Sequence, residues 1–359
     1  MKPVDPQAPP PKGHKKLSST GRRVTMTDIA RAAGCSQATV SFVLNNTAGM
    51  KLSAETRQRV LETASALGYA IPEAATAPIP AETPNRIGII VDQIATSPEA
   101  VQAIDGLSAA IQERGGLVYV GQSRGDSDVE ARLIDDFLQQ GISALVYLTI
   151  FTREVTPTTA LRNAPVPVYL LNCYTANQAT PSAVPSEIAG GQRSTHHLIT
   201  QGHRRIATIT GEIWMEAAQD RLKGYRRALA TADIPFEQYL VFEGDWSTSA
   251  GYEATRKILA LPDRPTAIFC QNDRMAVGCY QALKEAGLSI PQDMSVVGYD
   301  DEEIARHLHP QLTTSVLPHR AMGQWAAEQI LGGTEARASG MTKVECPLII
   351  RASVAPPRS

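Results

Sequence analysis

Short apolar runs that alternate with helix-like stretches constrain the fold of most of this chain. Runs rich in valine and isoleucine are typical of parallel strands buried on both faces, and they recur in two series, at residues 87–91, 117–120, 144–150 and 166–171, then at 206–210, 239–243, 267–270 and 295–299. The segments between them have helical periodicity, at residues 100–114, 129–140, 192–200, 220–231, 250–259 and 274–286. We therefore expect an α/β core made of two doubly wound lobes.

A proline- and alanine-rich segment precedes this core. Residues 71–84 read IPEAATAPIPAETP, and each proline removes a backbone donor and disfavours helix at the residue before it. We expect an atypical hinge or linker over 71–84, a two-lobed core over 85–355 and a separate small domain over 24–70. Residues 1–23 contain five prolines and six basic residues, which predicts a disordered tail.

Residues 25–43 (TMTDIARAAGCSQATVSFV) predict two short helices around one tight turn. Thr25 is a suitable N-cap, and Asp28 three residues later completes a capping-box-like pair with it. Gly34 can adopt the left-handed conformation that ends the first helix. Ser36 then caps a second helix with the apolar set Ala38, Val40, Val43 and Leu44. This is a helix-turn-helix pattern, which is typical of DNA-binding heads.

A third helix over residues 53–67 can close a small core with these two, so an ordinary three-helix subdomain is the alternative interpretation. If the head reads DNA, the N-terminal end of the second helix enters the major groove, where Gln37 can pair with adenine and the Ala38 methyl can contact a thymine methyl. The positions expected to lie against DNA are Thr25, Thr27, Ser36, Gln37, Ala38, Thr39, Ser41, Phe42 and Asn45.

The charge distribution favours DNA binding. Residues 1–70 contain ten Lys or Arg and four Asp or Glu, a balance of +6, whereas the whole chain carries −2, so the remainder carries −8. Such asymmetry indicates a polyanion-binding head on an acidic body. The alternative is that the basic residues of the N-terminal tail are only a solvated segment, although a loose basic arm can still contact phosphates.

Composition excludes several other classes of protein. With 359 residues and 43% hydrophobic content the chain can bury substantial cores, but no apolar run approaches the ~20 residues that cross a bilayer, and the N-terminus lacks the apolar centre of a secretory signal. We expect a cytoplasmic protein with no membrane contact. The five cysteines are scattered, and neither close histidine pair has metal-ligand spacing, so we expect reduced thiols and no metal.

Polar residues follow several predicted strands, where doubly wound sheets bind their ligands. Asp92, Asn172, Asn272 and Asp300 stand at or just after strand ends, Arg221 begins a helical stretch, and Trp246 lies in the loop EGDWSTSAG. Paired donors and acceptors beside an aromatic face suit the hydroxyls and C–H surface of a sugar or a similar polar molecule. The alternatives are that strand-end residues such as Asp273 only cap helices and that Trp246 belongs to the core. Asp301 with Glu302 and Glu303 can likewise be only a solvated helix start.

Five segments in order carry a family resemblance: the head at residues 25–45, HLITQGHRRIATITG at 197–211, DRLKGYRRAL at 220–229, QNDRMAVGCYQALKEAGLSIPQDMSVVGYDD at 271–301 and PQLTTSV at 310–316. Over roughly residues 24–352 the chain resembles the lactose-repressor/galactose-repressor (LacI/GalR) family of transcription regulators. The resemblance implies a DNA-binding head, a hinge and two Rossmann-like lobes resembling periplasmic sugar-binding proteins. In that family an effector binds between the lobes and changes how a dimer holds its operator.

The resemblance also implies roles for single residues. Gln37 and Ala38 stand at the base-reading pair, and Arg221 matches the effector-clasping arginine of an RLxGY motif. Four further residues match cleft positions, Asn272 and Asp300 more firmly than Asn172 and Asp92. Trp246 matches an aromatic of the cleft wall in some members, and Trp214 and Glu216 stand at variable positions that tune effector choice.

Two departures from the family pattern affect DNA recognition. The family often has a basic or polar residue where this chain has Phe42, so the operator sequence is not transferable and an apolar contact with a thymine methyl can replace a base contact. Relatives wedge a hinge-helix leucine into the minor groove, and the nearest counterpart here, Ile79, is flanked by Pro78 and Pro80. We therefore expect that this hinge does not fold in the usual way.

We interpret the chain as a homodimeric regulator of a palindromic double-stranded operator, with repression expected and with no cofactor beyond a small-molecule effector. No apolar heptad follows Arg351, so we do not expect a coiled-coil tetramer. The effector can be a sugar, a sugar acid or a nucleoside. A transport-associated binding protein would need an export signal, and an enzyme would need a catalytic set or a phosphate loop, which the sequence does not provide.

Overall fold

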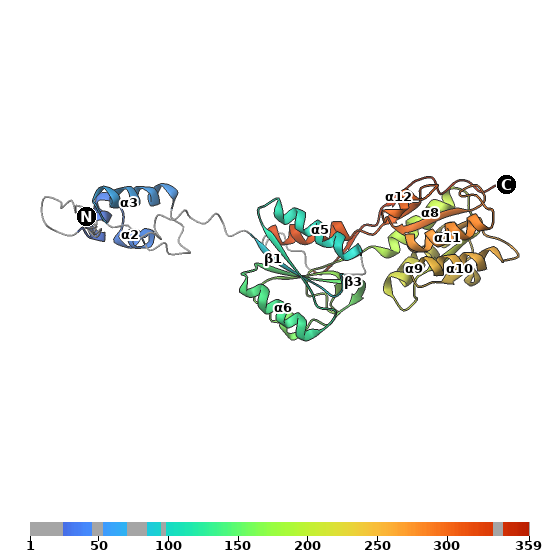
Figure 1. Cartoon of the computed structure of the whole chain (residues 1–359), viewed down its shortest axis with the longest axis horizontal. Coiled ribbons are helices and arrows are strands. Elements are labelled where there is room, and N and C mark those ends of the chain that lie inside the picture. Colours follow the sequence, from blue (N-terminus) through green and yellow to red (C-terminus); the bar gives the residue numbers. More distant parts are fainter. Residues whose placement is uncertain (1–23, 45–52, 70–84, 95–97, 333–339, 359) are drawn as a thin grey trace, which may run out of the picture. The chain divides into compact units, whose positions relative to one another are not determined.

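The computed structural model describes residues 24–44, 53–69, 85–94, 98–332 and 340–358. The chain divides into two compact units, Met1–Thr83 and Pro84–Ser359, and Figure 1 labels the main elements of each. Among the helices that the structure describes, none combines the length and the apolar content needed to span a bilayer.

The first unit contains α1 (Met26–Ala33), α2 (Gln37–Leu44) and α3 (Ala54–Ala66). The predicted capping box is confirmed, because the Thr25 hydroxyl accepts from the Asp28 N–H and the Asp28 carboxylate accepts from the Thr25 N–H. Gly34 ends α1 in the left-handed conformation with φ 65°. The Ser36 hydroxyl accepts from the Thr39 N–H at 3.0 Å and so caps α2.

The core of this head is small and apolar. Its buried residues come from all three helices: Ile29, Ala30, Ala33, Val40, Val43, Leu44, Val60 and Ala64. Arg59 of α3 donates to the Ala33 carbonyl at the end of α1, which supplies a partner for a helix-terminal acceptor. The assignment of Ala38 to the apolar set is wrong, because its side chain is exposed on the first turn of α2.

The second unit contains two six-stranded sheets, which confirms the two-lobe prediction. The N-terminal lobe has the strand order β11-β5-β4-β3-β1-β2, and its strands are β1 (Arg86–Val91), β2 (Leu117–Gln122), β3 (Ala144–Glu154), β4 (Val168–Tyr174), β5 (Ser182–Pro185) and β11 (Met341–Val344). Its helices are α5 (Pro98–Gln112), α6 (Ser127–Gln139), α7 (Thr159–Arg162) and α13 (His319–Leu331). Figure 1 shows α5 and α6 on opposite faces of this sheet.

The C-terminal lobe repeats the plan with the strand order β12-β10-β9-β8-β6-β7. Its strands are β6 (Ile206–Thr210), β7 (Val241–Glu243), β8 (Ala267–Cys270), β9 (Ser295–Asp300), β10 (Thr313–Val316) and β12 (Leu348–Ile349). Its helices are α8 (Glu187–Thr200), α9 (Glu216–Thr231), α10 (Thr248–Leu259), α11 (Asp273–Glu285) and α12 (Ile304–His307), with a 3₁₀ turn at Gln238–Leu240. Both lobes carry a buried apolar cluster on each face of the sheet.

The chain crosses between the lobes three times within the described residues. It crosses from β5 to α8, from β10 to α13 and from β11 to β12. The crossings lie side by side, because Ser186 donates to the Val344 carbonyl and Val316 donates to the Pro347 carbonyl. Residues on these connections therefore lie at the junction of the two lobes.

Periodicity missed the elements nearest to these crossings. Strands β5, β10, β11 and β12 have two to four residues each, and β5, β10 and β11 contain Ser, Thr, Pro or Lys, so they lack the uninterrupted apolar run of the equally short β8. Helix α13 is also absent from the predicted elements. The predicted strand over 239–243 is too long, because Gln238–Leu240 form a 3₁₀ turn and only Val241–Glu243 pair with β6.

Glycines allow three pairs of helices to pack backbone against backbone. The pairs are Gly106 and Gly323 between α5 and α13, Gly191 and Gly224 between α8 and α9, and Gly251 and Gly278 between α10 and α11. A methyl group on any of these six glycines would overlap a carbonyl oxygen of the partner helix. Each pair is reciprocal, one glycine on each helix. The closest helix packing in both lobes therefore depends on the absence of a side chain.

Gly251→Ala is expected to destabilise the second unit by about 1–3 kcal/mol, because the added methyl would meet the Met275 backbone, which cannot move like a flexible side chain. Chemical unfolding followed by circular dichroism would measure the change. Glu253→Ala, at an exposed position of the same helix, is the matched control and is expected to change stability by about 0.5 kcal/mol or less. Equal stability of the two variants would contradict the close packing.

Candidate functional site

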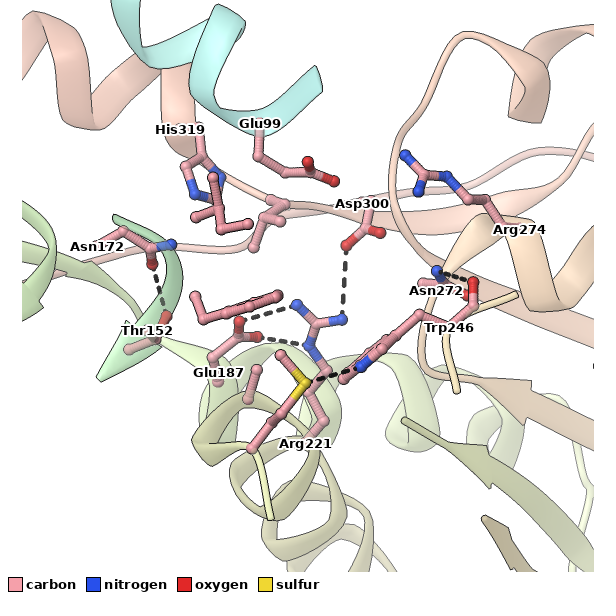
Figure 2. Close-up of a pocket in the computed structure, with 15 residues that line it drawn as sticks. Glu99, Thr152, Asn172, Glu187, Arg221, Trp246, Asn272, Arg274, Asp300 and His319 are labelled. Carbon is pink, nitrogen blue, oxygen red and sulfur yellow. Dashed lines mark hydrogen bonds and ion pairs between the residues drawn. The ribbon is translucent and has the colours of Figure 1, made fainter. Parts of the chain in front are cut away.

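A cavity of about 190 Å³ lies at the junction of the two lobes. Residues of both lobes line it, and the lobe crossings contribute Glu187, Leu317 and His319. Figure 2 shows the lining residues Glu99, Thr152, Asn172, Glu187, Arg221, Trp246, Asn272, Arg274, Asp300 and His319. Five of the seven predicted effector residues are among them, namely Asn172, Arg221, Trp246, Asn272 and Asp300.

Arg221 is the most constrained residue of the cavity. Its side chain is buried and makes a two-pronged ion pair with Glu187, with Nε–Oε2 at 2.8 Å and Nη2–Oε1 at 2.9 Å. Nη1 also donates to the Gln271 carbonyl and lies 3.5 Å from an Asp300 carboxylate oxygen. Burial alone would lower the pKa of Arg221, but the Glu187 carboxylate and Asp300 raise it above its ordinary value. The guanidinium is therefore permanently charged and held in one plane.

Aromatic rings complete the environment of this guanidinium. It lies over the Tyr299 ring, 3.8 Å from the centroid, and 5.5 Å from the centroid of the Trp246 ring. The Trp246 indole N–H points to the Met215 sulfur at 2.9 Å, and the ring packs against the apolar cluster beneath α10 and α11. Trp246 therefore packs against the core with one part of its ring and also forms a wall of the cavity.

Three of the predicted residues have strained backbones. Asn172 (φ 59°), Trp246 (φ 67°) and Asp300 (φ 109°) are among the seven non-glycine residues with positive φ in the part of the chain that the structure describes. Such conformations are costly for residues with a Cβ and concentrate at functional sites. Burial raises the pKa of Asp300 well above its usual range, although Arg221 opposes that shift.

The two asparagine amides are largely engaged within the protein. The Asn172 amide N donates to the Thr149 carbonyl at 2.9 Å, and its oxygen accepts from the Thr152 hydroxyl at 2.6 Å. The Asn272 oxygen accepts from the Met275 N–H, so Asn272, and not Asp273, is the N-cap of α11. Each amide keeps only part of its hydrogen-bonding capacity for another molecule.

Asp92 and Trp214 do not line the cavity. Asp92 accepts from the Ile150 N–H and pairs with Arg153 at 2.9 Å, which ties the end of β1 to β3. Trp214 is 68% exposed, and its ring stands edge-on to Phe151, which does line the cavity. Trp214 therefore lies beside the cavity at the meeting of the two lobes.

Glu216 also lies at this meeting of the lobes. It is the first residue of α9, and its carboxylate accepts a hydrogen bond from the Tyr174 hydroxyl of β4 at 3.0 Å. The variable positions singled out by the sequence thus connect the two lobes and do not reach into the cavity.

Sequence reasoning missed Glu99, Glu187, Arg274 and His319, all of which line the cavity. Glu187 stands two residues beyond β5 and His319 three residues beyond β10, so the strand-end rule that selected the other residues would have found both. These strands, SAVP and TTSV, lack the apolar run by which the others are recognised. Glu99 lies in the first turn of α5, where no strand-end signal applies.

On the head, the described residues among those predicted to face DNA lie at the start of α1 and along α2 from its first turn to Phe42. Gln37 and Ala38 are exposed, as are Thr25, Thr27 and Ser36, while Thr39, Ser41 and Phe42 are partly exposed. The first turn of α2 carries no acidic residue that would repel a phosphate. The predicted contacts Asn45 and Ile79 lie outside the described residues.

The positive charge of the head lies mostly outside its helices. The described residues 24–44 and 53–69 carry three arginines (Arg31, Arg57, Arg59) and three acids (Asp28, Glu55, Glu62), so their charges balance. The whole excess of +6 belongs to residues 1–23, which carry +5, and to Lys51.

Comparisons with known proteins bear on both units. Residues 25–72 match a family model described as bacterial regulatory proteins, lacI family, and residues 195–354 match one described as a periplasmic binding protein-like domain. The ribose operon repressor of Escherichia coli (strain K12) is 32% identical over 307 residues, which cover 86% of this chain and 92% of that protein. The HTH-type transcriptional repressor PurR of Aliivibrio salmonicida is 30% identical over 308 residues, covering 86% and 91%.

Solved structures show the same fold. A lacI-family regulator from Rhizobium etli has a TM-score of 0.69 and 29% identity, and it covers 76% of this chain and 99% of its own. The complex of the transcriptional regulator CelR with cellobiose has a TM-score of 0.62 and 29% identity, covering 92% and 100%. The lac repressor dimer bound to operator has a TM-score of 0.62 and 27% identity, covering 93% and 100%.

Asp273, the buried first residue of α11, makes stability depend on pH. Its carboxyl accepts from the Glu302 N–H at 2.8 Å and from the Thr314 hydroxyl at 2.7 Å, and burial raises its pKa to about 7. The unfolded chain releases this proton near the ordinary value of 3.8, so the folded state holds an extra proton between the two values. The stability contribution of Asp273 therefore falls as the pH rises from about 4 to about 7.

The side chain introduced by Asp273→Asn cannot ionise. In this variant the free energy of unfolding is therefore expected not to show the decrease between about pH 4 and about pH 7, which linkage puts at up to ~4 kcal/mol. Chemical unfolding of both proteins between about pH 4 and about pH 8 would measure it. Asp233→Asn, at an exposed position, controls for the loss of one charge. Parallel pH profiles for the wild type and Asp273→Asn would contradict the assignment.

Proposed function

Because this chain belongs to the LacI family of bacterial regulatory proteins and is a DNA-binding transcriptional repressor with an effector-binding core, we propose that the cavity around Arg221 is its effector site. The observation that carries the proposal is the fixed guanidinium of Arg221 between Glu187 and Asp300, beside the Trp246 ring. Oriented donors and acceptors next to an aromatic face bind a polyhydroxylated ring.

The size of the cavity favours a small effector. Pockets for drug-sized ligands measure about 300–1,000 Å³, so about 190 Å³ suits a molecule of one ring. Among the relatives, one is named a ribose operon repressor, and a regulator from Enterococcus faecium at 25% identity was solved with bound ribose. A sugar of this size, or a derivative of one, is the proposed class of effector.

Binding in this cavity can change operator affinity because its walls come from both lobes and from their crossings. A ligand that contacts Asn172 of the N-terminal lobe and Arg221 of the C-terminal lobe favours one arrangement of the lobes over others. Only such differential binding shifts a conformational equilibrium. Trp214 and Glu216, which contact the other lobe beside the cavity, are proposed to influence how readily the lobes separate.

On DNA, two copies of the head are proposed to read the halves of a palindrome, with Gln37 and Ala38 of α2 contacting bases. The hydroxyls of Ser36 and Thr39 hydrogen-bond each other at the start of α2, so we assign them to positioning the helix and to backbone contacts. Residues 1–23 supply nonspecific attraction to phosphates. A homodimer of this kind acts on chromosomal DNA in the cytoplasm and carries out no catalysis.

Arg221→Lys is expected to weaken the effector response of operator binding by about tenfold or more, because lysine cannot keep the planar, two-pronged contacts of the guanidinium. Lysine keeps the positive charge beside Glu187, so the variant avoids leaving that carboxylate buried and unpaired. Operator binding would be measured by gel shift or anisotropy against a panel of neutral monosaccharides. Arg227→Lys on the exposed side of α9 is the control, and an unchanged response of Arg221→Lys would remove Arg221 from the site.

Gln37→Ala is expected to change operator preference at one base position of each half-site, with a cost of about 1–3 kcal/mol for the preferred base. The operator would first be isolated by selecting genomic fragments with the purified protein, and each base would then be varied in binding assays. Gln58→Ala, on the exposed side of α3, is the control. A loss of affinity that is equal for all sequences would instead make Gln37 a backbone contact.

A further inference from the structure

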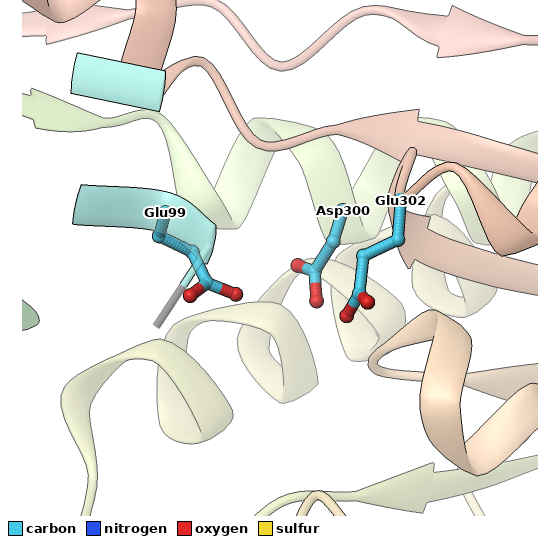
Figure 3. A group of neighbouring side chains, drawn as sticks. All are labelled: Glu99, Asp300 and Glu302. Carbon is cyan, nitrogen blue, oxygen red and sulfur yellow. The ribbon is translucent and has the colours of Figure 1, made fainter. Parts of the chain in front are cut away.

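Three carboxylates gather at one side of the cavity. Oxygens of Glu99, Asp300 and Glu302 lie within 4.8 Å of one another, and Figure 3 shows the three side chains directed toward a common space. Two guanidiniums contact this group, since Arg221 lies 3.5 Å from Asp300 and Arg274 lies 3.0 Å from Glu302.

The negative charge of this region exceeds the positive charge. Glu187 already occupies two nitrogens of Arg221, so Glu187, Asp300 and Glu302 together share the two guanidiniums of Arg221 and Arg274. Proximity of the other carboxylates opposes ionisation, and burial together with Glu99 raises the pKa of Glu302. A positive charge placed among these groups would relieve this repulsion.

His319 provides a second, independent indication of a ligand. Its side chain is 3% exposed and lines the cavity, yet among the described residues neither ring nitrogen has a hydrogen-bond partner. Figure 2 shows it on the same side of the cavity as Glu99. Burial lowers the pKa of His319 to about 4, so the ring is neutral at physiological pH and offers one nitrogen as an acceptor. Buried polar atoms without partners are rare and call for a ligand or water.

Building on the function proposed above, we propose that the effector carries a protonated amine, as an amino sugar or another amine-bearing polyol does, and that this group lies between Glu99, Asp300 and His319. An ammonium has three donors, two for the carboxylates and one for the imidazole nitrogen. The ring of the effector then lies toward the apolar wall of Trp246, Met215 and Leu317.

An organic cation fits the surroundings better than a metal ion does. The space between the carboxylates continues into a cavity with apolar walls, which suits a ring carrying a charged group. A divalent ion at the same place would lie close to the guanidiniums of Arg221 and Arg274, which already hold Asp300 and Glu302.

An anionic effector does not fit. Among the described residues that line the cavity, Arg221 and Arg274 are the arginines, and both already contact carboxylates, so a ligand carboxylate or phosphate would face negative charge. Of the three effector classes that the sequence left open, a sugar acid is therefore excluded.

Matched ligands test the proposal directly. The full chain would be titrated calorimetrically with D-glucosamine, D-glucose and D-glucuronate, and with the corresponding galactose and mannose sets, and each compound would also be assayed for its effect on operator binding. In at least one set the amine is expected to bind about tenfold or more tightly than the neutral sugar, since charge-assisted hydrogen bonds are roughly twice as strong as neutral ones. The acid is expected not to bind.

Two variants locate the amine. Glu99→Gln keeps the shape and removes one charge, and His319→Phe keeps a ring and removes the acceptor nitrogen. Both variants are expected to reduce the preference for the amine over the neutral sugar by about tenfold. Glu113→Gln, at the exposed residue that follows α5, is the control and is expected to keep the preference. Circular dichroism would confirm that each variant is folded.

The outcomes separate this inference from the function on which it rests. Neutral sugars that bind as tightly as the amines, or an unchanged preference in Glu99→Gln, would overturn the inference and leave the effector site in place. If no compound binds or alters operator affinity, the assignment of the cavity as the effector site fails as well. Stabilisation by Mg²⁺, Ca²⁺ or Mn²⁺ alone, lost in Glu99→Gln, would replace the amine with a metal ion.

Discussion

The buried ion pair between Arg221 and Glu187 is the contact on which the cavity depends. Glu187 begins α8 just after the first lobe crossing, and Arg221 lies in α9, so the pair fixes the C-terminal lobe to the junction of the lobes. Removing one partner of such a pair costs ~3–5 kcal/mol, because the other charge stays buried without compensation. Gly191, one turn beyond Glu187 on the same face of α8, lets the Arg221 backbone approach closely enough for the pair to form.

The same arrangement recurs in the N-terminal lobe. Gly323 of α13 packs against the Ala103 carbonyl of α5, and one turn earlier on each helix stand His319 and Glu99. A glycine contact thus brings two side chains together at the cavity in each lobe, an ion pair in one and an imidazole beside a carboxylate in the other. The close packing of the helices and the placement of the site have one structural cause.

Much of this arrangement could be predicted from the sequence. Strand-end polarity selected Asn172, Asn272 and Asp300, which line the cavity, because uninterrupted apolar runs precede them. Glu187 and His319 escaped prediction because the strands before them, SAVP and TTSV, contain no such run. Asp92 does not line the cavity, because a strand-end carboxylate can equally bind the neighbouring backbone. The helix pairing through glycines was also not predictable, since it involves partners whose approach only the tertiary structure defines.

Strain and charge at the cavity point to the same conclusion about how it works. Asn172, Trp246 and Asp300 hold unfavourable backbone conformations, and the raised pKa of Asp300 reflects a carboxylate in a setting that does not favour its charge. The surrounding structure must supply the free energy for both, and a ligand that brings a hydrogen-bond donor or a positive charge to Asp300 recovers part of the cost of burying that carboxylate. Asn172 and Asp300 belong to different lobes, so a ligand can contact both only when the lobes are close together around it. Ligand binding therefore stabilises one arrangement of the lobes relative to the others. A regulator needs such a difference in order to couple effector binding to its affinity for DNA.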